Sequence, residues 1–164
     1  MGDQNFPGQR RPRNATDGRA AIWAGIAAGA GSALAQVLLW LAFTDALPHA
    51  LFRDARLTAA ILLGQGVLPP PATFDAVIML ISALIHCALS IVYGLALAWV
   101  LARTGAGASL WIGALFGLAL YAVNLYGFTA LFPWFAQVRD WITITAHLVF
   151  GVTAARVYRY LERR

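Results

Sequence analysis

Residues 76–102 read AVIMLISALIHCALSIVYGLALAWVLA and contain no charged side chain. A helix crosses the hydrocarbon core of a bilayer in about 20 residues. This stretch of 27 residues therefore predicts a membrane-spanning helix. His86 lies near its middle. Because ionisable groups are costly inside a membrane, His86 is the first candidate for a functional residue.

The composition of the whole chain also indicates a membrane protein. Of the 164 residues, 60% are hydrophobic and only 12% are charged, whereas soluble domains carry a charged fraction of about 25%. The net charge of +5 comes from arginines at the ends of the apolar runs, which is a topology signal and gives no reason to expect nucleic acid as a partner. One cysteine, Cys87, excludes an intrachain disulfide, and three distant histidines form no local metal motif.

Three more apolar runs resemble residues 76–102. We predict membrane spans at about 20–44, 76–102, 110–132 and 138–158, after a disordered basic tail at 1–19. The run at 20–44 is too long for the apolar core of a signal peptide, about 7–15 residues, so we expect an uncleaved helix. The last run is short, and we expect Arg139 and Arg156 to extend it by snorkelling.

The longest connection, 46–74, is an outer loop that is expected to contain a short amphipathic helix, as an interfacial or re-entrant segment. Residues 49–64 read HALFRDARLTAAILLG, too few to span a bilayer. Its apolar face is predicted to consist of Leu51, Phe52, Ala55 and Ala59, with Arg53, Asp54 and Arg56 at the level of the lipid headgroups. Three prolines follow at 69–71, and we expect Thr73 to cap the next helix with Asp75 in its first turn.

The arginine distribution predicts the orientation. Nine of the twelve arginines lie in the N-terminal tail, the loop after residue 102 and the C-terminal tail. The other two loops hold only Arg53, Arg56 and Arg139. The positive-inside rule then places both termini in the cytoplasm.

An internal repeat relates the two halves of the chain. Trp23-x-Gly25-x3-Gly29-x6-Gln36 matches Trp111-x-Gly113-x3-Gly117-x6-Asn124, and His86-x3-Ser90-x3-Gly94 matches His147-x3-Gly151 more loosely. The pattern predicts an all-α membrane protein of four transmembrane helices arranged as two tandem helical hairpins in the same orientation. The loop at 46–74 is the part that the second hairpin lacks.

Spacings of four and seven residues place small and polar side chains on one face of each predicted helix. The predicted packing residues are Gly25, Gly29, Gly94, Gly113, Gly117 and Gly151. The predicted intramembrane polar core contains Gln36, Ser82, His86, Ser90, Asn124, Thr143 and His147. We expect this core to contain no Asp, Glu or Arg.

Two chemistries are open to the histidine pair besides simple hydrogen-bonded packing. His86 and His147 are predicted at similar depths on diagonal helices, an arrangement that could hold haem b between two imidazoles. Alternatively, they could serve a small oligomeric transporter or a proton relay, since histidine titrates near neutral pH. Packing is the simplest of the three, because no haem-specific motif accompanies the pair.

No nucleophile with a neighbouring base is evident, so we expect no catalytic activity. Charged residues gather at the outer boundary instead, and they could form an anion-binding or interaction surface. The members of this predicted outer surface are Arg53, Arg56, Asp75, Arg139 and Asp140. Helix ends commonly carry such charges for structural reasons alone.

The second half of the chain resembles the YagU-like bacterial inner-membrane proteins. The matching residues are His86-x3-Ser90-Ile91, Trp111-x-Gly113-x3-Gly117, Pro133-Trp134, His147-Leu148-Val149 and the terminal arginines, within residues 83–164. The resemblance implies an inner-membrane location and a link to acid resistance, without an assigned activity. We therefore expect a structural or stress-related component that acts in the lipid bilayer through partners, as a homo-oligomer or as a subunit of a membrane complex.

Overall fold

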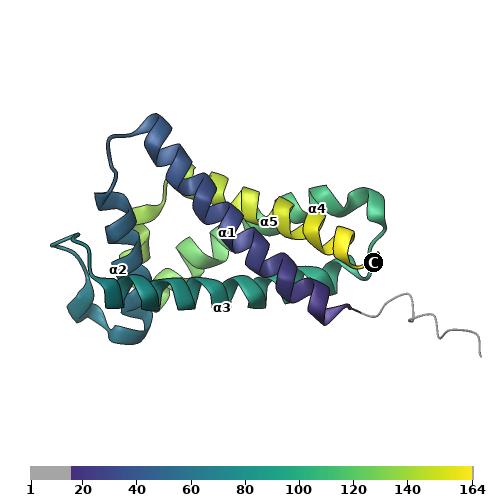
Figure 1. The fold of residues 1–164 in the computed structure, drawn as a ribbon, viewed down its shortest axis with the longest axis horizontal. Coiled ribbons are helices and arrows are strands. Elements are labelled where there is room, and N and C mark those ends of the chain that lie inside the picture. The colour runs from purple at the N-terminus through teal and green to yellow at the C-terminus, as the bar shows by residue number, and fades with distance from the viewer. Residues whose placement is uncertain (1–15, 164) are drawn as a thin grey trace, which may run out of the picture.

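The computed structural model describes residues 16–163, and these fold into five α-helices joined by turns and loops (Figure 1). The helices are α1 (Gly18–Phe43), α2 (His49–Leu63), α3 (Ala76–Leu101), α4 (Ser109–Ala122) and α5 (Trp141–Leu161). No strand occurs in this part of the chain. The predicted disorder of the N-terminal tail falls on residues 1–15, outside the described residues. Its last residues, 18 and 19, already belong to α1, which Asp17 caps by accepting a hydrogen bond from the amide of Ala20.

Three segments are long and apolar enough to cross a membrane: Gly18–Phe43, Ala76–Leu101 and Ser109–Ala130. The helix α5, predicted as a fourth span at 138–158, is not among them. Its position explains the difference, because α5 lies between α1 and α4 (Figure 1). It buries eight residues along its length: Ile142, Thr143, Ala146, Phe150, Gly151, Ala154, Ala155 and Tyr158. A helix largely surrounded by protein needs less apolar surface than one that faces lipid.

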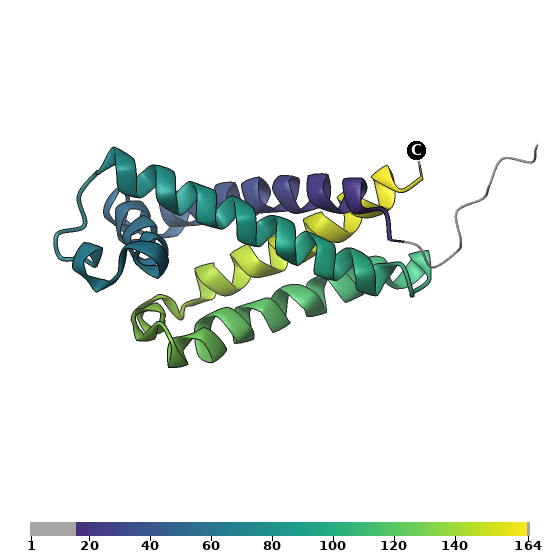
Figure 2. The ribbon, with the colours of Figure 1, turned by 90° about the horizontal axis from the view of Figure 1, so that it is seen from below.

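The helices form a bundle that is closed at one end and open at the other. α1 packs against both α3 and α5, and α5 packs also against α4. α3 and α4 converge at the loop that joins them and diverge toward α2 (Figure 2). The alanine-rich core between α1, α3 and α5 contains Ala21, Ala28, Leu97, Ala98 and Ala155. Small side chains here let the helix axes approach closely.

α2 lies across the open end of the bundle (Figure 1). Two apolar clusters hold it there: Leu57 packs with Tyr121, Leu125 and Val138, and Ala50 packs with Trp40 and Ile142. The indole Nε1–H of Trp134 donates a hydrogen bond to the carbonyl oxygen of Leu57 at 3.0 Å. We call this side of the molecule the α2 end. The opposite side, with the first and last described residues, is the terminal end.

Asp75, not Thr73, caps α3. Its carboxylate accepts hydrogen bonds from the amides of Val77 and Ile78 at 2.9 and 3.0 Å. Thr73 instead accepts hydrogen bonds from the guanidinium of Arg56 through its carbonyl and hydroxyl oxygens. The aspartate was the better choice because its charge also suits the positive end of the helix dipole.

The predicted span at 110–132 is an α-helix only as far as Ala122. A π-helical turn, Val123–Gly127, and a 3-10 turn, Phe128–Ala130, continue it. The guanidinium of Arg139 donates to the carbonyl oxygen of Leu125 at 2.7 Å and packs on the ring of Tyr126. π-Helical turns widen a helix locally and are frequent at functional sites, and this one carries Asn124.

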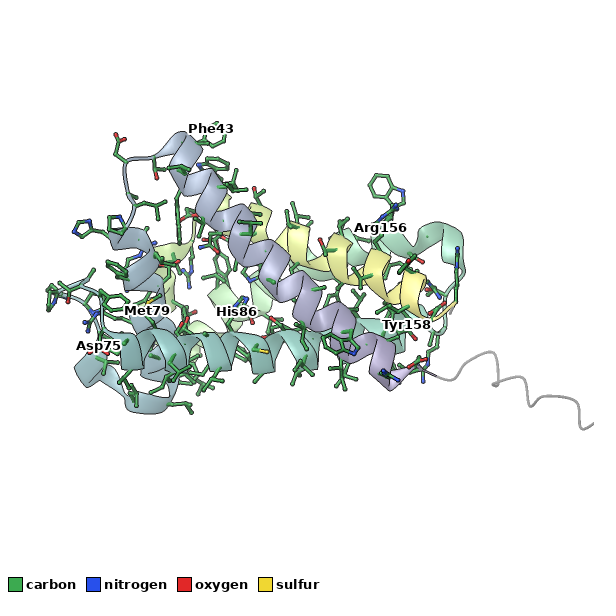
Figure 3. The ribbon with its side chains drawn as sticks, in the orientation of Figure 1. Phe43, Asp75, Met79, His86, Arg156 and Tyr158 are labelled. Carbon is green, nitrogen blue, oxygen red and sulfur yellow. The ribbon has the colours of Figure 1, made fainter. Side chains whose placement is uncertain are left out.

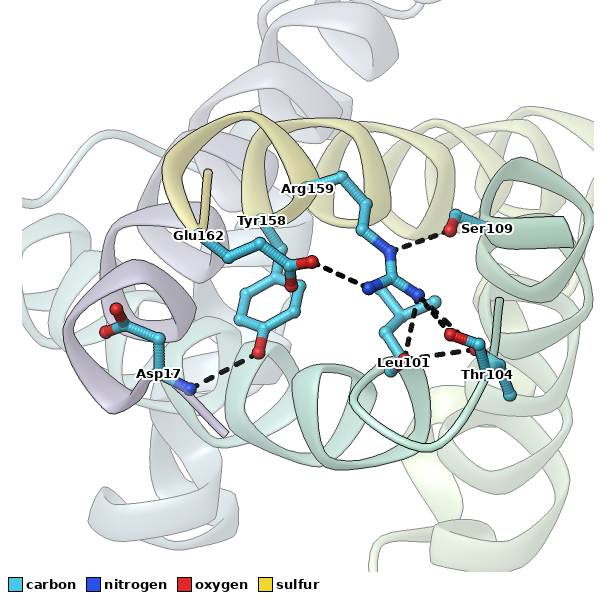
Figure 4. Close-up of polar contacts among 7 residues, drawn as sticks. All are labelled: Asp17, Leu101, Thr104, Ser109, Tyr158, Arg159 and Glu162. Atoms are coloured by element: carbon cyan, nitrogen blue, oxygen red, sulfur yellow. Dashed lines mark hydrogen bonds and ion pairs between the residues drawn. The ribbon is translucent and has the colours of Figure 1, made fainter. Parts of the chain in front are cut away.

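A hydrogen-bond network around Arg159 ties the terminal end together (Figure 4). Its guanidinium donates to the hydroxyl of Ser109, the carboxylate of Glu162 and the carbonyl oxygens of Leu101 and Thr104. The phenol oxygen of Tyr158 accepts a hydrogen bond from the amide of Asp17 at 3.3 Å. The start of α1, the end of α5 and the α3–α4 loop therefore meet in one place.

Candidate functional site

A cavity of about 410 Å³ lies where α3 and α4 diverge, under α2. Residues of α1, α2, α3 and α5 and of the π-helical and 3-10 turns that follow α4 contribute to it, and we call it the central cavity. Its apolar walls include Leu57, Ile61, Ile85, Leu89, Phe128, Phe132, Phe135 and Phe150. Its polar lining is Ser32, Gln36, Asp54, Thr58, His86, Ser90, Tyr93, Asn124, Thr143 and His147. A mostly apolar pocket with a few converging polar groups is the usual form of a small-molecule site.

One set of polar groups forms a hydrogen-bonded chain across the cavity. The hydroxyl of Tyr93 donates to Asn124 Oδ1 at 2.7 Å, and Asn124 Nδ2 lies 3.3 Å from His147 Nε2. His147 Nδ1 lies 2.8 Å from the carbonyl oxygen of Thr143. Since that oxygen can only accept, Nδ1 carries the proton and Nε2 accepts from Asn124. Side chains from α3, the π-helical turn after α4 and α5 are thus joined through a neutral histidine.

His86 lies on the other side of the cavity and points toward the centre of the molecule (Figure 3). Its Nε2 lies 3.1 Å from the carbonyl oxygen of Gly29 on α1, so this nitrogen is the donor. Its ring is exposed to the cavity rather than enclosed by protein. The remaining nitrogen, Nδ1, is then an acceptor.

Asp54 of α2 brings a carboxylate to the same cavity, which differs from two expectations. It was expected at the headgroup level, and the core was expected to contain no acidic group. Its oxygens accept hydrogen bonds from Arg53 Nε at 2.8 Å and Gln36 Nε2 at 3.1 Å. Burial raises the pKa of Asp54 above its usual value, although the charge of Arg53 acts in the opposite direction.

Six of the seven residues predicted for the polar core line this cavity. They are Gln36, His86, Ser90, Asn124, Thr143 and His147, while Ser82 does not reach it. Asp54 and Tyr93 were not predicted. A signal for Asp54 was present in the sequence, because Asp54, Leu57, Thr58 and Ile61 follow the helical spacing of three and four. All four line the cavity.

The predicted packing glycines fall into two groups, one in each half of the chain. A methyl group on Gly25 or Gly29 of α1 would collide with Ser90 of α3, and one on Gly94 would lie 2.7 Å from the Cα of Gly25. The second group behaves in the same way between α4 and α5. A methyl group on Gly113 would meet Gly151, one on Gly117 would meet the carbonyl group of His147, and one on Gly151 would meet Gly113. The repeated sequence motif therefore makes the same kind of close helix contact twice.

The residues predicted as an outer surface bind parts of their own chain. Arg53 pairs with Asp54, Arg56 holds the 64–75 loop, and Arg139 bonds to the end of the π-helical turn. Asp75 caps α3, and Asp140 caps α5 through the amide of Thr143. Their contacts show structural roles within the chain, and the anion-binding surface stays a prediction.

The cavity residues do not fit a haem held by two histidines. Such a haem needs a free lone pair on one nitrogen of each ring. In His147, Nδ1 donates to Thr143 and Nε2 accepts from Asn124, so neither nitrogen is free. Within residues 16–163 no group of three or more His, Cys, Asp or Glu side chains could hold a metal ion. Cys87 is exposed on α3.

No family model, curated protein or solved structure matches this chain. The resemblance to the YagU-like proteins stays a prediction. The geometry alone defines the site: a cavity with apolar walls, the titratable side chains of Asp54, His86, Tyr93 and His147, and a hydrogen-bonded polar lining. The side chains can bind and orient a ligand or hold a proton. No hydroxyl among the lining residues is paired with a base as a nucleophile would need to be.

Proposed function

We propose that the chain is a four-span protein of the bacterial inner membrane with both termini in the cytoplasm. Its two tandem hairpins, α1–α3 and α4–α5, each consist of two antiparallel helices. Two observations support this. The first and last described residues lie at the same end of the molecule, joined through Asp17 and Tyr158. Arg103, Arg156 and Arg159 belong to that same end, as the positive-inside rule requires of the cytoplasmic side. α5 then spans the membrane as an inner helix shielded from lipid by α1 and α4.

This topology can be tested with single cysteines in a Cys87→Ser background. Gly66 and Gly107 lie in the loops at opposite ends, and neither has an atom close to the position of an added side chain. A membrane-impermeant maleimide added to intact spheroplasts should label Gly66→Cys and should label Gly107→Cys only after lysis. Labelling of both before lysis, or the reverse order, would contradict the proposal.

Within this framework the protein binds a small amphiphilic molecule from the bilayer in the central cavity and has no catalytic activity. The observation that supports this function is the lining of the cavity. A purely apolar molecule would leave the acceptor nitrogen of His86 without a partner, and an ion would face walls that are mostly aromatic or aliphatic. A molecule with an apolar body and a hydrogen-bonding head suits both parts.

We expect lateral entry on the side of α3 and of the segment after α4, because these helices diverge toward the α2 end (Figure 2) and both segments line the cavity. Leu89 of α3 and Phe128 of the 3-10 turn after α4 both line the cavity. A ligand can therefore pass from the outer half of the bilayer without crossing a polar surface. The expected role as a structural or stress-related component, alone or with partners, would then depend on ligand occupancy.

A pair of probes with the same apolar body tests this function. Decanol carries a hydroxyl head and decane does not. Decanol should raise the thermal unfolding midpoint of the purified protein in detergent, and decane should raise it less. Leu89→Trp fills the cavity and should abolish the difference between the probes. Leu84→Trp, on the same helix but 62% exposed on its outer side, should preserve it. Equal effects of both probes on the wild type, or no effect of filling, would contradict the proposal.

A second candidate, a proton-linked passage related to acid tolerance, is favoured by one observation. Asp54, His86 and His147 line the same cavity, so the cavity contains a carboxyl group as well as two imidazole groups. Proton flux into proteoliposomes with an internal pH dye should fall in Asp54→Asn and remain unchanged in Asp45→Asn, an exposed aspartate outside the central cavity. Equal flux in both variants and in protein-free liposomes would exclude this candidate.

A further inference from the structure

A second hollow lies at the terminal end, between the start of α4 and the end of α5. It measures about 710 Å³ and is lined on one side by Arg156 and Arg159 of α5 and by Arg163 in the turn that follows this helix. Ser109 and Leu110, the first residues of α4, form the other side. We call it the arginine groove. It is separate from the central cavity, with which it shares no lining residue.

The charge of the groove is positive. A spacing of three places Arg156 and Arg159 on neighbouring positions of α5, Arg163 of the following turn lines the same hollow, and no acidic residue is in the lining. Arg159 is already engaged, since its guanidinium binds Ser109, Glu162 and two carbonyl oxygens (Figure 4). Arg156 and Arg163 are exposed, and neither has a hydrogen-bond or salt-bridge partner among the described residues. Arg159 therefore shapes the groove, and the other two arginines leave its positive charge uncompensated.

The backbone adds to this charge. The groove includes Ser109, where α4 begins, and no side chain caps that helix. The first amides of a helix carry a partial positive charge and bind anions such as phosphate. The guanidinium groups and the helix start thus favour an anion in the same place.

The groove also has an apolar wall, made by Leu110, Ala155 and Val157. Leu110 is 47% exposed although it is large and apolar. Trp111 and Leu115, on the same helix as Leu110, are also large, apolar and exposed. An acyl chain can follow this surface from the groove, whereas a free phosphate ion would use none of it.

We propose that the arginine groove binds the phosphate of an acidic phospholipid of the cytoplasmic leaflet, with Arg156 and Arg163 at the headgroup and an acyl chain along Leu110. The proposal depends on the membrane orientation given under Proposed function, but it does not depend on the ligand of the central cavity. Basic pockets between membrane helices on the cytoplasmic side are known to hold such headgroups.

Native mass spectrometry of the full chain in a neutral detergent tests the proposal. The protein is titrated with phosphatidylglycerol or with phosphatidylcholine of the same acyl chains. We expect phosphatidylglycerol to be retained preferentially. Each arginine near an anionic lipid contributes about fivefold to binding, so Arg156→Gln with Arg163→Gln should lower that retention by roughly 25-fold. Circular dichroism checks that this exposed double variant folds.

Arg103→Gln is the matched control, because Arg103 is exposed at the same end, stacks on Trp99 and does not line the groove. It should reduce retention by less than about twofold. An equal loss in the control, or no preference for phosphatidylglycerol, would overturn the proposal. Inorganic phosphate that competes fully at millimolar concentration would show a soluble-anion site instead. Leu89→Trp should leave lipid retention unchanged, so a failure of the proposed central-cavity function is distinguishable from a failure of lipid binding in the arginine groove. The maleimide experiment tests the membrane orientation separately.

Discussion

Gly151 offers the sharpest test of the close contact between α4 and α5. A methyl group at this position would meet the carbonyl oxygen of Gly113 and would lie 2.8 Å from the amide nitrogen of Gly117. Ordinary contacts of a Cβ begin at 3.4 Å, so at Gly117 the helices must separate by about 0.6 Å. Both of these contacts are with backbone atoms of α4, so no side chain can rotate away to make room. Overpacking of this kind costs about 1–3 kcal/mol, and we expect Gly151→Ala to lose that much free energy of unfolding.

The matched control is Gly31→Ala on α1. A methyl group there would lie 3.8 Å from Cγ2 of Thr153, an ordinary contact. Because alanine restricts the unfolded chain more than glycine does, this variant should gain about 0.5–1 kcal/mol. Both variants are unfolded in mixed micelles of increasing SDS fraction and followed by far-UV circular dichroism. A Gly151→Ala variant as stable as the wild type would refute the close contact. Equal losses at both positions would assign the effect to the glycine backbone and not to packing.

Three further predictions use the same unfolding assay or a close relative of it. Since burial raises the pKa of Asp54, the folded state holds the carboxyl proton more tightly than the unfolded state does, so this residue makes the wild type more stable as pH falls from neutral toward the usual carboxyl range. Unfolding at pH 7, 6, 5 and 4 should show a smaller gain in stability for Asp54→Asn than for the wild type. Parallel curves for the two proteins would contradict this. Arg159→Gln leaves several acceptors without their donor and should cost about 1–3 kcal/mol, compared with less than about 0.5 kcal/mol for Arg103→Gln. Trp134→Phe removes the hydrogen bond to the carbonyl oxygen of Leu57 and should speed amide hydrogen exchange in α2 while leaving α1 and α5 unchanged.

Sequence patterns predicted the helical class and the membrane-crossing length of three helices, because both depend on composition and local spacing. The predicted bounds 76–102 and 20–44 differ from α3 and α1 by at most two residues at each end. The prediction was weaker for the third span, where a π-helical and a 3-10 turn replace the last part of a regular helix. Hydropathy does not register such changes, since they arise from how Arg139 and the following turn satisfy backbone carbonyls.

The periodicity of the sequence predicted most of the polar residues that line the cavity, but it did not predict that α2 contributes to this lining. The faces of α1, α3, α4 and α5 were inferred from spacing, and the residues on them do line one cavity. Asp54 was assigned to the headgroup region because it stands between two arginines in the sequence. Its actual environment depends on how α2 folds back over the bundle, a tertiary arrangement set by Leu57, Trp40 and their neighbours. The local sequence therefore predicts which residues of α2 share a helix face, but it does not predict which part of the molecule that face contacts.

The repeat is also less symmetrical than the motif implied. Gln36 and Asn124 occupy equivalent positions, yet Gln36 binds Asp54 while Asn124 binds His147 and Tyr93. The difference arises because only the first half carries the extra helix α2. A comparison of motifs treats equivalent residues as equal, and a long insertion changes the partners of one of them.

The divergence of α3 from α4 has a mechanical consequence (Figure 2). In the four-span topology that we propose, helices that converge at one end and separate at the other occupy a larger cross-section in one leaflet than in the other. Lateral pressure in a bilayer acts on that difference in area, so membrane tension and curvature do work on the angle between these two helices. Stretching the outer leaflet should widen the wedge and compression should narrow it. The tension and curvature of the bilayer would then change the angle between α3 and α4.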